Sequence, residues 1–337
     1  TEEQMQTTCQ QLAQSGKVNV LRAGIWKPRT RPNAFEGVGK EALTWLKQAG
    51  IDNNLPVATE VANAQHVEAC LKAGVDILWI GARTTVNPFS VQEVADALKG
   101  VDIPILVKNP VNPDLQLWIG ALERIHQAGV TKLGAIHRGF SSFQKTAYRN
   151  VPKWEIPIEL KATFPEIDII CDPSHIAGTR SLLATVAQKA MDLEMTGLMI
   201  ESHVNPDEAW SDAKQQINPE SLNELIGNLT IRSTEASSFE TSSELTAFRK
   251  IIDEIDESLI QTLVSRMALS EKIGQYKLDN NVTILQIKRW EEIKKTRMEH
   301  AHCEGLNNEF VKNLLQLIHK ESIRQQTDVM NKSVTVG

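Results

Sequence analysis

Short runs of apolar and β-branched residues alternate with longer segments of helical periodicity from the start of the chain to about residue 227. The apolar runs have the length and composition of strands that are buried on both faces of a parallel sheet. The predicted strands are residues 18–25, 56–60, 77–81, 105–108, 133–137, 167–171 and 197–201. The predicted helices between them include residues 63–73, 91–98, 115–127 and 181–194.

Alternating strands and helices predict an α/β fold with a parallel sheet. Seven strands can be counted, and a helical pattern over residues 2–15 comes before the first of them. A series of this kind that opens on a helix lacks the strand before it, and one more strand would give eight. We therefore expect a (β/α)8 TIM barrel whose first strand is absent from a sequence that starts at Thr1 rather than at a methionine.

The hydrophobic pattern changes towards the C-terminus. Residues 228–243 are rich in Ser, Thr and Glu and are interpreted as a polar linker. Beyond the linker, apolar positions recur every three or four residues, which predicts helices at 244–280, 285–300 and 307–328. The first of these would span roughly 50 Å, too long to pack against itself, and this favours an intertwined homodimer.

This division assigns a barrel domain to residues 1–227 and an all-α domain to residues 244–337. With 41% hydrophobic and 23% charged residues, the chain is ordinary for a globular protein, which excludes disorder as its main state. No run approaches the roughly 18 apolar residues of a membrane-spanning helix. The net charge of −6 argues against a general nucleic-acid binder.

The four cysteines form no C-x-x-C pair, so we expect free thiols and a cytoplasmic location. His300, His302 and Cys303 are close in sequence, but positions i and i+2 of a helix point apart. We therefore interpret these three as surface residues.

Charged residues collect at the predicted strand ends, where a TIM barrel has its active site. A concentration of cations in an acidic protein suits two phosphorylated or carboxylated substrates held together. The cations in question are Arg22, Lys27, Arg29, Arg83, Lys108 and Arg138. His175, Glu201 and Asp212 add one nitrogen and two carboxylates, a mixture that suits a divalent cation such as Mn²⁺, Fe²⁺, Co²⁺ or Zn²⁺.

Six motifs in this order resemble a known family. They are KPRT at 27–30, IGARTT at 80–85, LVKN at 106–109, HRG at 137–139, DPSH at 172–175 and ESH at 201–203. Residues 1–227 are similar to type Iβ 3-deoxy-D-arabino-heptulosonate 7-phosphate (DAHP) synthase. The resemblance implies an aldol-like condensation of phosphoenolpyruvate with erythrose 4-phosphate, the first step of the shikimate pathway.

The resemblance also implies roles for individual residues. Arg83 and Arg138 would hold the phosphate of phosphoenolpyruvate. Arg22, Lys27 and Lys108 would bind the carboxylate side of the same substrate. Lys108 would also lie near the reacting carbons. The erythrose 4-phosphate contacts would be Lys27, Arg29 and Thr30.

Three of the family's four metal ligands would be His175, Glu201 and Asp212, holding Mn²⁺ or a similar ion. The fourth ligand of the family is a Cys in a Gly-Pro-Cys-Ser motif on the first strand, and this sequence contains no such motif. Cys9 lies within the opening helix and does not replace it. We expect that the sequence starts just after the missing strand and ligand.

The long predicted helix carries cations at helical spacing. Arg266 and Lys277 share a face, whereas Arg249 lies about 25 Å from Arg266 and would reach the same small ligand only from a partner chain. Ser322 and Gln326 also share a face. From spacing alone, a solvated charged face remains an open interpretation.

Residues 244–328 resemble an AroQ-type chorismate mutase, through ELTAFRKIIDEIDESLIQTLVSRM, GQYK, LQIKRWEEI and KESIRQQ. The resemblance implies the cofactor-free rearrangement of chorismate to prephenate. Its site residues would be Arg266, Lys277, Arg289, Ser322 and Gln326, with Arg249 from the other subunit. Gln286 and Trp290 depart from the common pattern, because an Asp and a Glu are frequent at those positions.

Three interpretations follow. The first is a bifunctional enzyme, in which Lys108, Arg266, Lys277 and Gln326 are catalytic. The second is a synthase whose helical domain mainly dimerises the protein and senses chorismate or prephenate as a feedback ligand. The third is a different phosphate-handling barrel aldolase, with Lys108 as a Schiff-base lysine.

Overall fold

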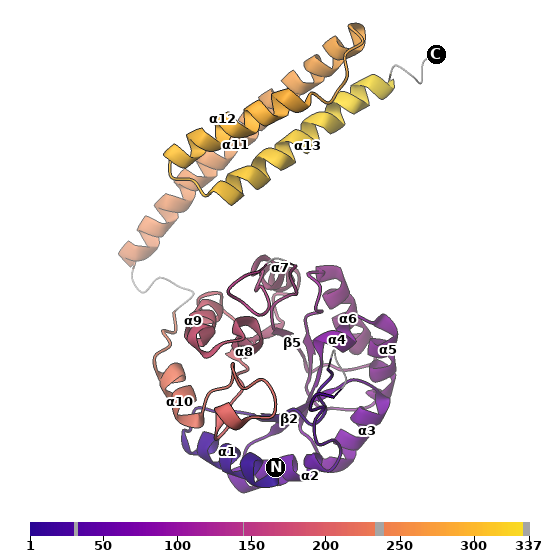
Figure 1. Cartoon of the computed structure of the whole chain (residues 1–337), viewed down its shortest axis with the longest axis vertical. Helices are drawn as coiled ribbons and strands as arrows, with labels where there is room; N and C mark the ends of the chain where they lie inside the picture. The colour runs from indigo at the N-terminus through magenta and orange to yellow at the C-terminus, as the bar shows by residue number, and fades with distance from the viewer. Residues whose placement is uncertain (30–32, 144, 233–238, 333–337) are drawn as a thin grey trace. The chain divides into compact units, whose positions relative to one another are not determined.

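The computed structural model describes residues 1–29, 33–143, 145–232 and 239–332, with side chains from 243 to 331 in the last range. The chain divides into two compact units, Thr1–Thr234 and Glu235–Gly337. The first unit is an α/β unit and the second is helical (Figure 1).

The first unit is built on a seven-stranded sheet in which each strand pairs in parallel with the next along the chain. The strands curl around a common centre and the helices lie outside them (Figure 1). The prediction of an α/β barrel architecture is therefore confirmed. The strands are β1 (Leu21–Ala23), β2 (Val57–Val61), β3 (Ile77–Ile80), β4 (Ile105–Lys108), β5 (Leu133–His137), β6 (Asp168–Cys171) and β7 (Gly197–Leu198).

Helices precede, connect and follow these strands. They are α1 (Glu2–Gln14), α2 (Ala42–Asn53), α3 (Ala64–Ala73), α4 (Ala82–Thr85), α5 (Pro88–Ala97), α6 (Leu115–Gln127), α7 (Glu155–Thr163), α8 (Pro173–Ala177), α9 (Leu183–Asp192) and α10 (Pro219–Gly227), with short 3₁₀ turns at Arg180–Leu182 and Pro206–Glu208. Side-chain caps fix several starts: Asn63, Asn87 and Asp114 each accept from a backbone N–H in the first turn.

Two predicted strands are at least three residues longer than the observed ones. The segment 18–25 forms a strand only at β1, because the chain then folds back and Lys27 N–H donates to the Glu36 carbonyl. The segment 197–201 forms a strand only at β7, because the N–H of Glu201 donates to the Ser174 hydroxyl. Both differences place charged residues in loops directly after the strands.

The main core lies between the sheet and its helices, with Leu78, Ile80 and Trp118 among its fully buried side chains. A smaller core fills the inside of the curled sheet, where Ala58, Trp79 and Ile136 meet. Branched and aromatic residues on both sheet faces produce the continuous apolar runs of the sequence.

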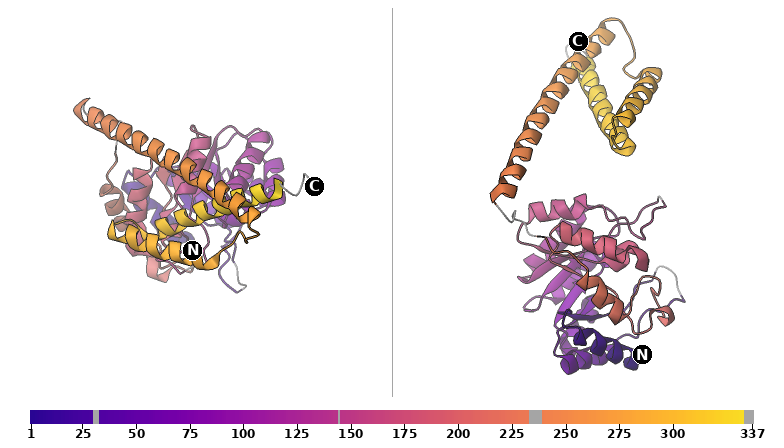
Figure 2. Two further views of the ribbon diagram at one scale, coloured as in Figure 1. Left: turned by 90° about the horizontal axis from the view of Figure 1, so that it is seen from above. Right: turned by 90° about the vertical axis from the view of Figure 1, so that its left-hand side faces the viewer.

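The second unit contains three helices, α11 (Phe239–Asp279), α12 (Ile287–Cys303) and α13 (Asn308–Lys332). The first helix begins inside the segment predicted as a linker, since Ser, Thr and Glu are well tolerated in first turns. It has 41 residues and therefore a length of about 60 Å. Its N-terminal part extends beyond the other two helices of the unit (Figure 2).

Helices α11 and α13 pack closely where a glycine removes the side chain between them. A Cβ added to Gly274 would lie 3.0 Å from the Gln326 Cα. None of the helices in the described ranges is long and apolar enough to cross a membrane.

Candidate active sites

Buried charged side chains gather at the carboxyl ends of the strands in the first unit. Arg22 on β1 donates to Glu201 Oε1 at 2.7 Å, and Gln215 donates to Glu201 Oε2 at 2.5 Å. Burial alone would raise the pKa of Glu201, but His175, Arg22 and Lys27 outweigh burial and hold that pKa below its ordinary value. Glu201 is therefore an anion among cations.

A second ion pair spans the sheet from β4 to the residue after β6. Lys108 Nζ lies 2.8 Å from Asp172 Oδ2, and both side chains are almost wholly buried. The same oxygen lies 2.9 Å from His175 Nδ1, while Asp172 Oδ1 accepts from the His175 backbone N–H. Burial alone would raise the pKa of Asp172, but His175 and Lys108 hold it well below its ordinary value. Asp172 thus fixes both the lysine and the imidazole.

Asp212 attracts three cations. Arg149 lies 2.9 Å from its Oδ1, and Lys27 and Arg29 lie 3.5 and 3.6 Å from its Oδ2. Lys27 also donates to the Ser211 hydroxyl at 2.7 Å. Burial alone would raise the pKa of Asp212, but Lys27 and Arg149 hold it well below its ordinary value. Ion pairs therefore connect the loop after β1 to the segment around Asp212.

Arg138, directly after β5, is a buried cation with polar support. Its guanidinium donates to Asn150 Oδ1 at 2.8 Å, and its backbone N–H donates to Asn109 Oδ1 at 2.7 Å. Burial, with the nearby charges of Arg149 and Arg83 acting in the same direction against the opposing carboxylate of Asp172, lowers its pKa to about 10. A guanidinium held among other cations in a buried setting is suited to receive an anion.

Arg22, Lys27, Arg29, Lys108 and Arg138, which were predicted at strand ends, have polar contacts there that the sequence did not indicate. Thr30 lies outside the described residues. Glu60 was expected at the rim, because it ends a predicted strand, but was assigned no role. The missed residues are Arg149, Asn150 and Gln215, which come from loops without any periodic pattern.

The predicted metal ligands have donor atoms of the right type, but in this structure their partners are other side chains. Across residues 1–29, 33–143, 145–232 and 239–332, no three His, Cys, Asp or Glu side chains stand close enough together to hold a metal ion. Glu201 and Asp212 instead face arginine and lysine. The carboxylate of Asp172 beside His175 Nδ1 is the outer partner that a metal-binding histidine usually has. The donor chemistry therefore fits a divalent cation that displaces these cationic partners.

In the helical unit, four of the predicted site residues meet between α11 and α13. Arg266 donates to the Ser322 hydroxyl at 2.5 Å, and Lys277 donates to Gln326 Oε1 at 3.0 Å. Lys277 also donates to the Ile284 carbonyl at 2.6 Å. Burial lowers the pKa values of both Arg266 and Lys277. This cluster offers two cations and a side-chain amide to an anionic ligand.

The other two predicted cations of this unit have different surroundings. Arg289 pairs with Glu292 at 2.7 Å on its own helix, and Arg249 is exposed on α11. Trp290, beside Arg289, stacks on His319 with ring centroids 3.9 Å apart. The unusual Trp290 therefore forms an aromatic contact with α13 rather than supplying a carboxylate.

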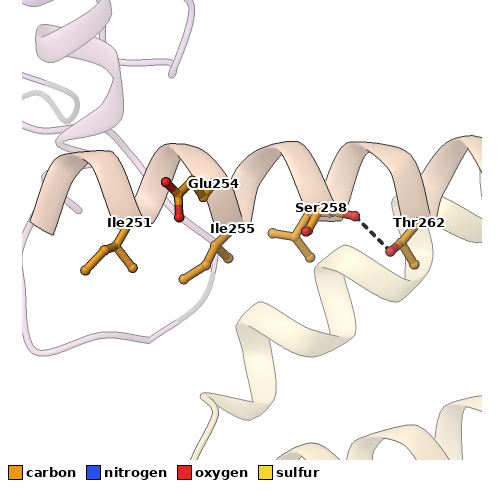
Figure 3. Close-up of a pocket in the computed structure, with 6 residues that line it drawn as sticks. Ile251, Glu254, Ile255, Ser258 and Thr262 are labelled. Carbon is orange, nitrogen blue, oxygen red and sulfur yellow. Dashed lines mark hydrogen bonds between the residues drawn. The ribbon is translucent and has the colours of Figure 1, made fainter.

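The exposed part of α11 has an apolar face. Ile251, Ile255 and Leu259 line an open hollow of about 360 Å³ together with Glu254, Ser258 and Thr262. In Figure 3 the isoleucines project from one side of the helix, and the Thr262 hydroxyl donates to the Ser258 carbonyl. Both isoleucines and the leucine are more than half exposed. A single helix does not bury this face by itself.

The class of protein is defined by a curled parallel sheet with buried cations at its strand ends, followed by a helical unit with a buried cation cluster. Residues 1–235 match the DAHP synthetase I family, and the chain belongs to that family. Residues 248–327 match chorismate mutase type II. The family assignments made from the sequence motifs are confirmed, and both families are enzyme families.

The chain is 30% identical over 224 residues to the phospho-2-dehydro-3-deoxyheptonate aldolase of Thermotoga maritima, covering 66% of this chain and 64% of that protein. The crystal structure of that DAHP synthase superimposes with a TM-score of 0.61 at 29% identity, covering 67% of this chain and 64% of that one. The helical part is 30% identical over 92 residues to a bifunctional chorismate mutase/prephenate dehydratase of Buchnera aphidicola, covering 27% of this chain and 24% of that protein. The chain thus spans less than two thirds of the length of these relatives.

Proposed function

We propose that the first unit condenses phosphoenolpyruvate with erythrose 4-phosphate to form DAHP and phosphate. The observation that carries this proposal is the convergence of Arg22, Lys27, Lys108 and Arg138 on one rim, beside buried carboxylates. Cations held in place before the substrates arrive offset the repulsion between two phosphorylated reactants and hold them together.

The residues have separate tasks in this proposal. Arg83 and Arg138 bind the phosphate of phosphoenolpyruvate, which suits the buried guanidinium of Arg138. Arg22, Lys27 and Lys108 bind the carboxylate side of the same substrate. Lys27 together with Arg29 and Thr30 binds the phosphate end of erythrose 4-phosphate. At Arg22, Lys27 and Lys108 the substrate anions then replace carboxylates that now face these cations.

His175, Glu201 and Asp212 would hold a divalent metal ion such as Mn²⁺. When bound, such an ion supplies Lewis acidity to the aldehyde oxygen. Asp172 orients the imidazole of His175 for this task through its contact with Nδ1.

The chemistry balances with these two substrates and one water. The enol carbon of phosphoenolpyruvate attacks the aldehyde carbon and forms the new carbon–carbon bond, and the aldehyde oxygen takes up a proton. Water adds at the carbon that carries the phosphate ester, a proton leaves, and phosphate departs. Lys108 holds the carboxylate side during attack, and no base is assigned to the water step.

A Schiff-base mechanism at Lys108 is the less favoured alternative. An amine nucleophile has to lose its proton before it attacks a carbonyl. The Lys108 ammonium is instead engaged in a buried ion pair, with Asp172 Oδ2 at 2.8 Å. Trapping with borohydride in the presence of substrate would reveal a covalent adduct if this alternative held.

For the second unit we propose the rearrangement of chorismate to prephenate. Arg266 and Arg289, with Arg249 of a partner subunit, would clamp the two carboxylates in the reactive conformer. Lys277 and Gln326, now hydrogen bonded to each other, would stabilise negative charge on the ether oxygen. No cofactor takes part.

We also propose a homodimer formed through α11. Its apolar face around Ile255 and Leu259 is exposed, and a second copy of the same helix offers a matching surface (Figure 3). Because Arg249 lies 17 positions before Arg266 on one helix, it serves the same ligand only across such an interface.

A regulatory role of the helical unit is the second candidate, with chorismate or prephenate acting as a feedback ligand of the synthase. The regulatory role is supported by the presence of an early and a late step of the pathway in one chain. For location we propose the cytoplasm, supported by cysteines that are free at all four positions. Cleaving the chain between the units and measuring the response of the synthase to prephenate tests the regulatory role.

A coupled assay on the full chain with both substrate sets tests the main proposal. We expect condensation that stops with a chelator and rearrangement that does not. Absence of condensation after Mn²⁺ has been supplied would reject the synthase assignment for this chain.

A further inference from the structure

The inside of the curled sheet holds an indole that meets three charged side chains of the rim. Trp79 on β3 is 1% exposed. Its Nε1–H donates to Glu60 Oε2 at 3.0 Å. The Arg22 guanidinium lies 5.3 Å from the ring centroid, and the Lys108 ammonium lies 5.7 Å from it. Both distances are within the range of cation–π attraction.

We propose that Trp79 is a positioning residue for the binding of phosphoenolpyruvate, acting through Arg22 and Lys108. The inference rests on the proposed function, which assigns these two cations to the carboxylate side of that substrate. Trp79 lies beneath both cations without being a substrate contact itself.

The need for such a platform comes from the ion pairs at the rim. Arg22 is paired with Glu201, and Lys108 is paired with Asp172. An anionic substrate competes with these carboxylates for the same cations, so the ion pairs alone do not fix the cations once substrate binds. The face of an indole carries no formal charge and is not displaced by an anion. The cations therefore keep one neighbour while their anionic partners exchange.

The edge of the indole fixes a third charge. Besides the hydrogen bond from Trp79, the Glu60 carboxylate lies against Gly81, where an added Cβ would be 2.0 Å from Glu60 Oε1. A carboxylate held on two sides keeps a constant distance from the neighbouring cations, and hence a constant electrostatic effect on them. Trp79 thus sets the geometry of two cations with its face and of one anion with its edge.

Two substitutions separate the two contributions. Trp79→Phe keeps an aromatic face but removes the N–H donor, whereas Trp79→Leu removes both. Trp118→Phe and Trp118→Leu are matched controls, because Trp118 is 0% exposed and its indole donates to a backbone carbonyl, that of Val107, rather than to a charged side chain. Each variant of the full chain is compared with the wild type by thermal melting before it is used.

The decisive readout is the dissociation constant of phosphoenolpyruvate by titration calorimetry, measured beside steady-state kinetics. We expect Trp79→Leu to weaken binding about thirtyfold, and Trp79→Phe to recover most of that loss. The KM for erythrose 4-phosphate should change less than about threefold, which a general loss of structure would not produce. The Trp118 variants should bind phosphoenolpyruvate within about twofold of the wild type.

Folded Trp79→Leu protein that binds phosphoenolpyruvate as tightly as the wild type would overturn the inference. So would an equal loss in the Trp118→Leu control. If the wild-type chain binds phosphoenolpyruvate but does not condense it, the proposed function fails and the binding data still decide the role of Trp79. If the wild-type chain binds no phosphoenolpyruvate, both proposals fail.

Discussion

The Lys277 ammonium lies 3.0 Å from the side-chain oxygen of Gln326, and this hydrogen bond joins α11 to α13 across 49 positions of sequence. Both side chains are 8% exposed. The absence of a side chain at Gly274 allows the two helices to approach at the same level. A buried cation is therefore held beside a neutral amide rather than a carboxylate, which leaves its charge available to an anionic ligand.

Replacing this lysine tests the mutase assignment. In Lys277→Ala, we expect kcat for chorismate to fall roughly a thousandfold, because the main positive charge near the ether oxygen is lost. The exposed Lys272 on the same helix provides the control, and Lys272→Ala should retain wild-type rates. Condensation by the same preparations should be unchanged and shows that the protein is intact. Mutase turnover near wild-type rates in Lys277→Ala would remove this residue from the catalytic set.

Metal removal distinguishes the two proposed reactions within one chain. Dialysis against a chelator should abolish condensation, because His175, Glu201 and Asp212 would have lost the ion that activates the aldehyde. Rearrangement of chorismate should continue at its full rate, since nothing in that site needs a metal. Adding Mn²⁺ back should restore condensation. Condensation that persists after chelation, with metal content verified as zero by atomic absorption, would contradict the metal assignment.

The fold followed from the sequence because its determinants are local. Strands buried on both faces leave unbroken apolar runs, so β4 and β5 were predicted to the residue. The ends of β1 and β7 were predicted less well, since a contact from a distant residue, such as the Ser174 hydroxyl on the Glu201 N–H, decides where the strand stops.

The candidate sites were only partly predictable for the same reason. Arg22 and Lys108 stand at strand ends, and the rule that barrels carry their chemistry there identified them. Arg149 contacts Asp212 across 63 positions from a loop without periodicity, so no local pattern indicated it. The partners Glu201 and Asp172 were visible as residues, but their pairing with Arg22 and Lys108 depends on how the sheet curls.

His137 leads to a prediction about acid stability. Its ring is completely buried beside Trp154 and Phe140. Burial lowers its pKa to about 3, with Arg138 acting in the same direction. As pH falls below about 6.5, the unfolded chain binds a proton at this position and the folded chain does not. The free energy of unfolding therefore decreases with falling pH until about pH 3.

Substitution isolates this contribution from the other titrating groups. Between pH 6.5 and pH 4.5, His137→Phe should lose roughly 2–3 kcal/mol less unfolding free energy than the wild type. The exposed His126 supplies the control, and His126→Gln should follow the wild-type curve. Urea titrations at several pH values measure these differences. Parallel curves for His137→Phe and the wild type would show that the imidazole is not kept neutral by the fold.

Mixing two inactive variants tests the proposed dimer and its shared site together. Arg249→Ala and Arg266→Ala should each abolish mutase activity, because one residue reaches the ligand from the partner subunit and the other from the same subunit. Unfolding and refolding the two variants as an equimolar mixture produces heterodimers in which one site has both arginines and the other has neither. Half of the dimers are then mixed, so mutase activity should recover to about a quarter of the wild-type value.

The apolar face of α11 provides the second half of this test. Ile255→Asp introduces a charge into the surface that the partner should cover, so the protein should sediment as a monomer at micromolar concentration and lose mutase activity. Ile158→Asp is the control. Ile158 is also an exposed isoleucine, with 47% of its surface accessible against 54% for Ile255, but it lies on α7 of the first unit. Sedimentation velocity on the same samples reports the association state. If the mixed variants stay inactive while the wild type sediments as a dimer, the chain dimerises without sharing its site, and Arg249 is not a ligand of the partner's substrate.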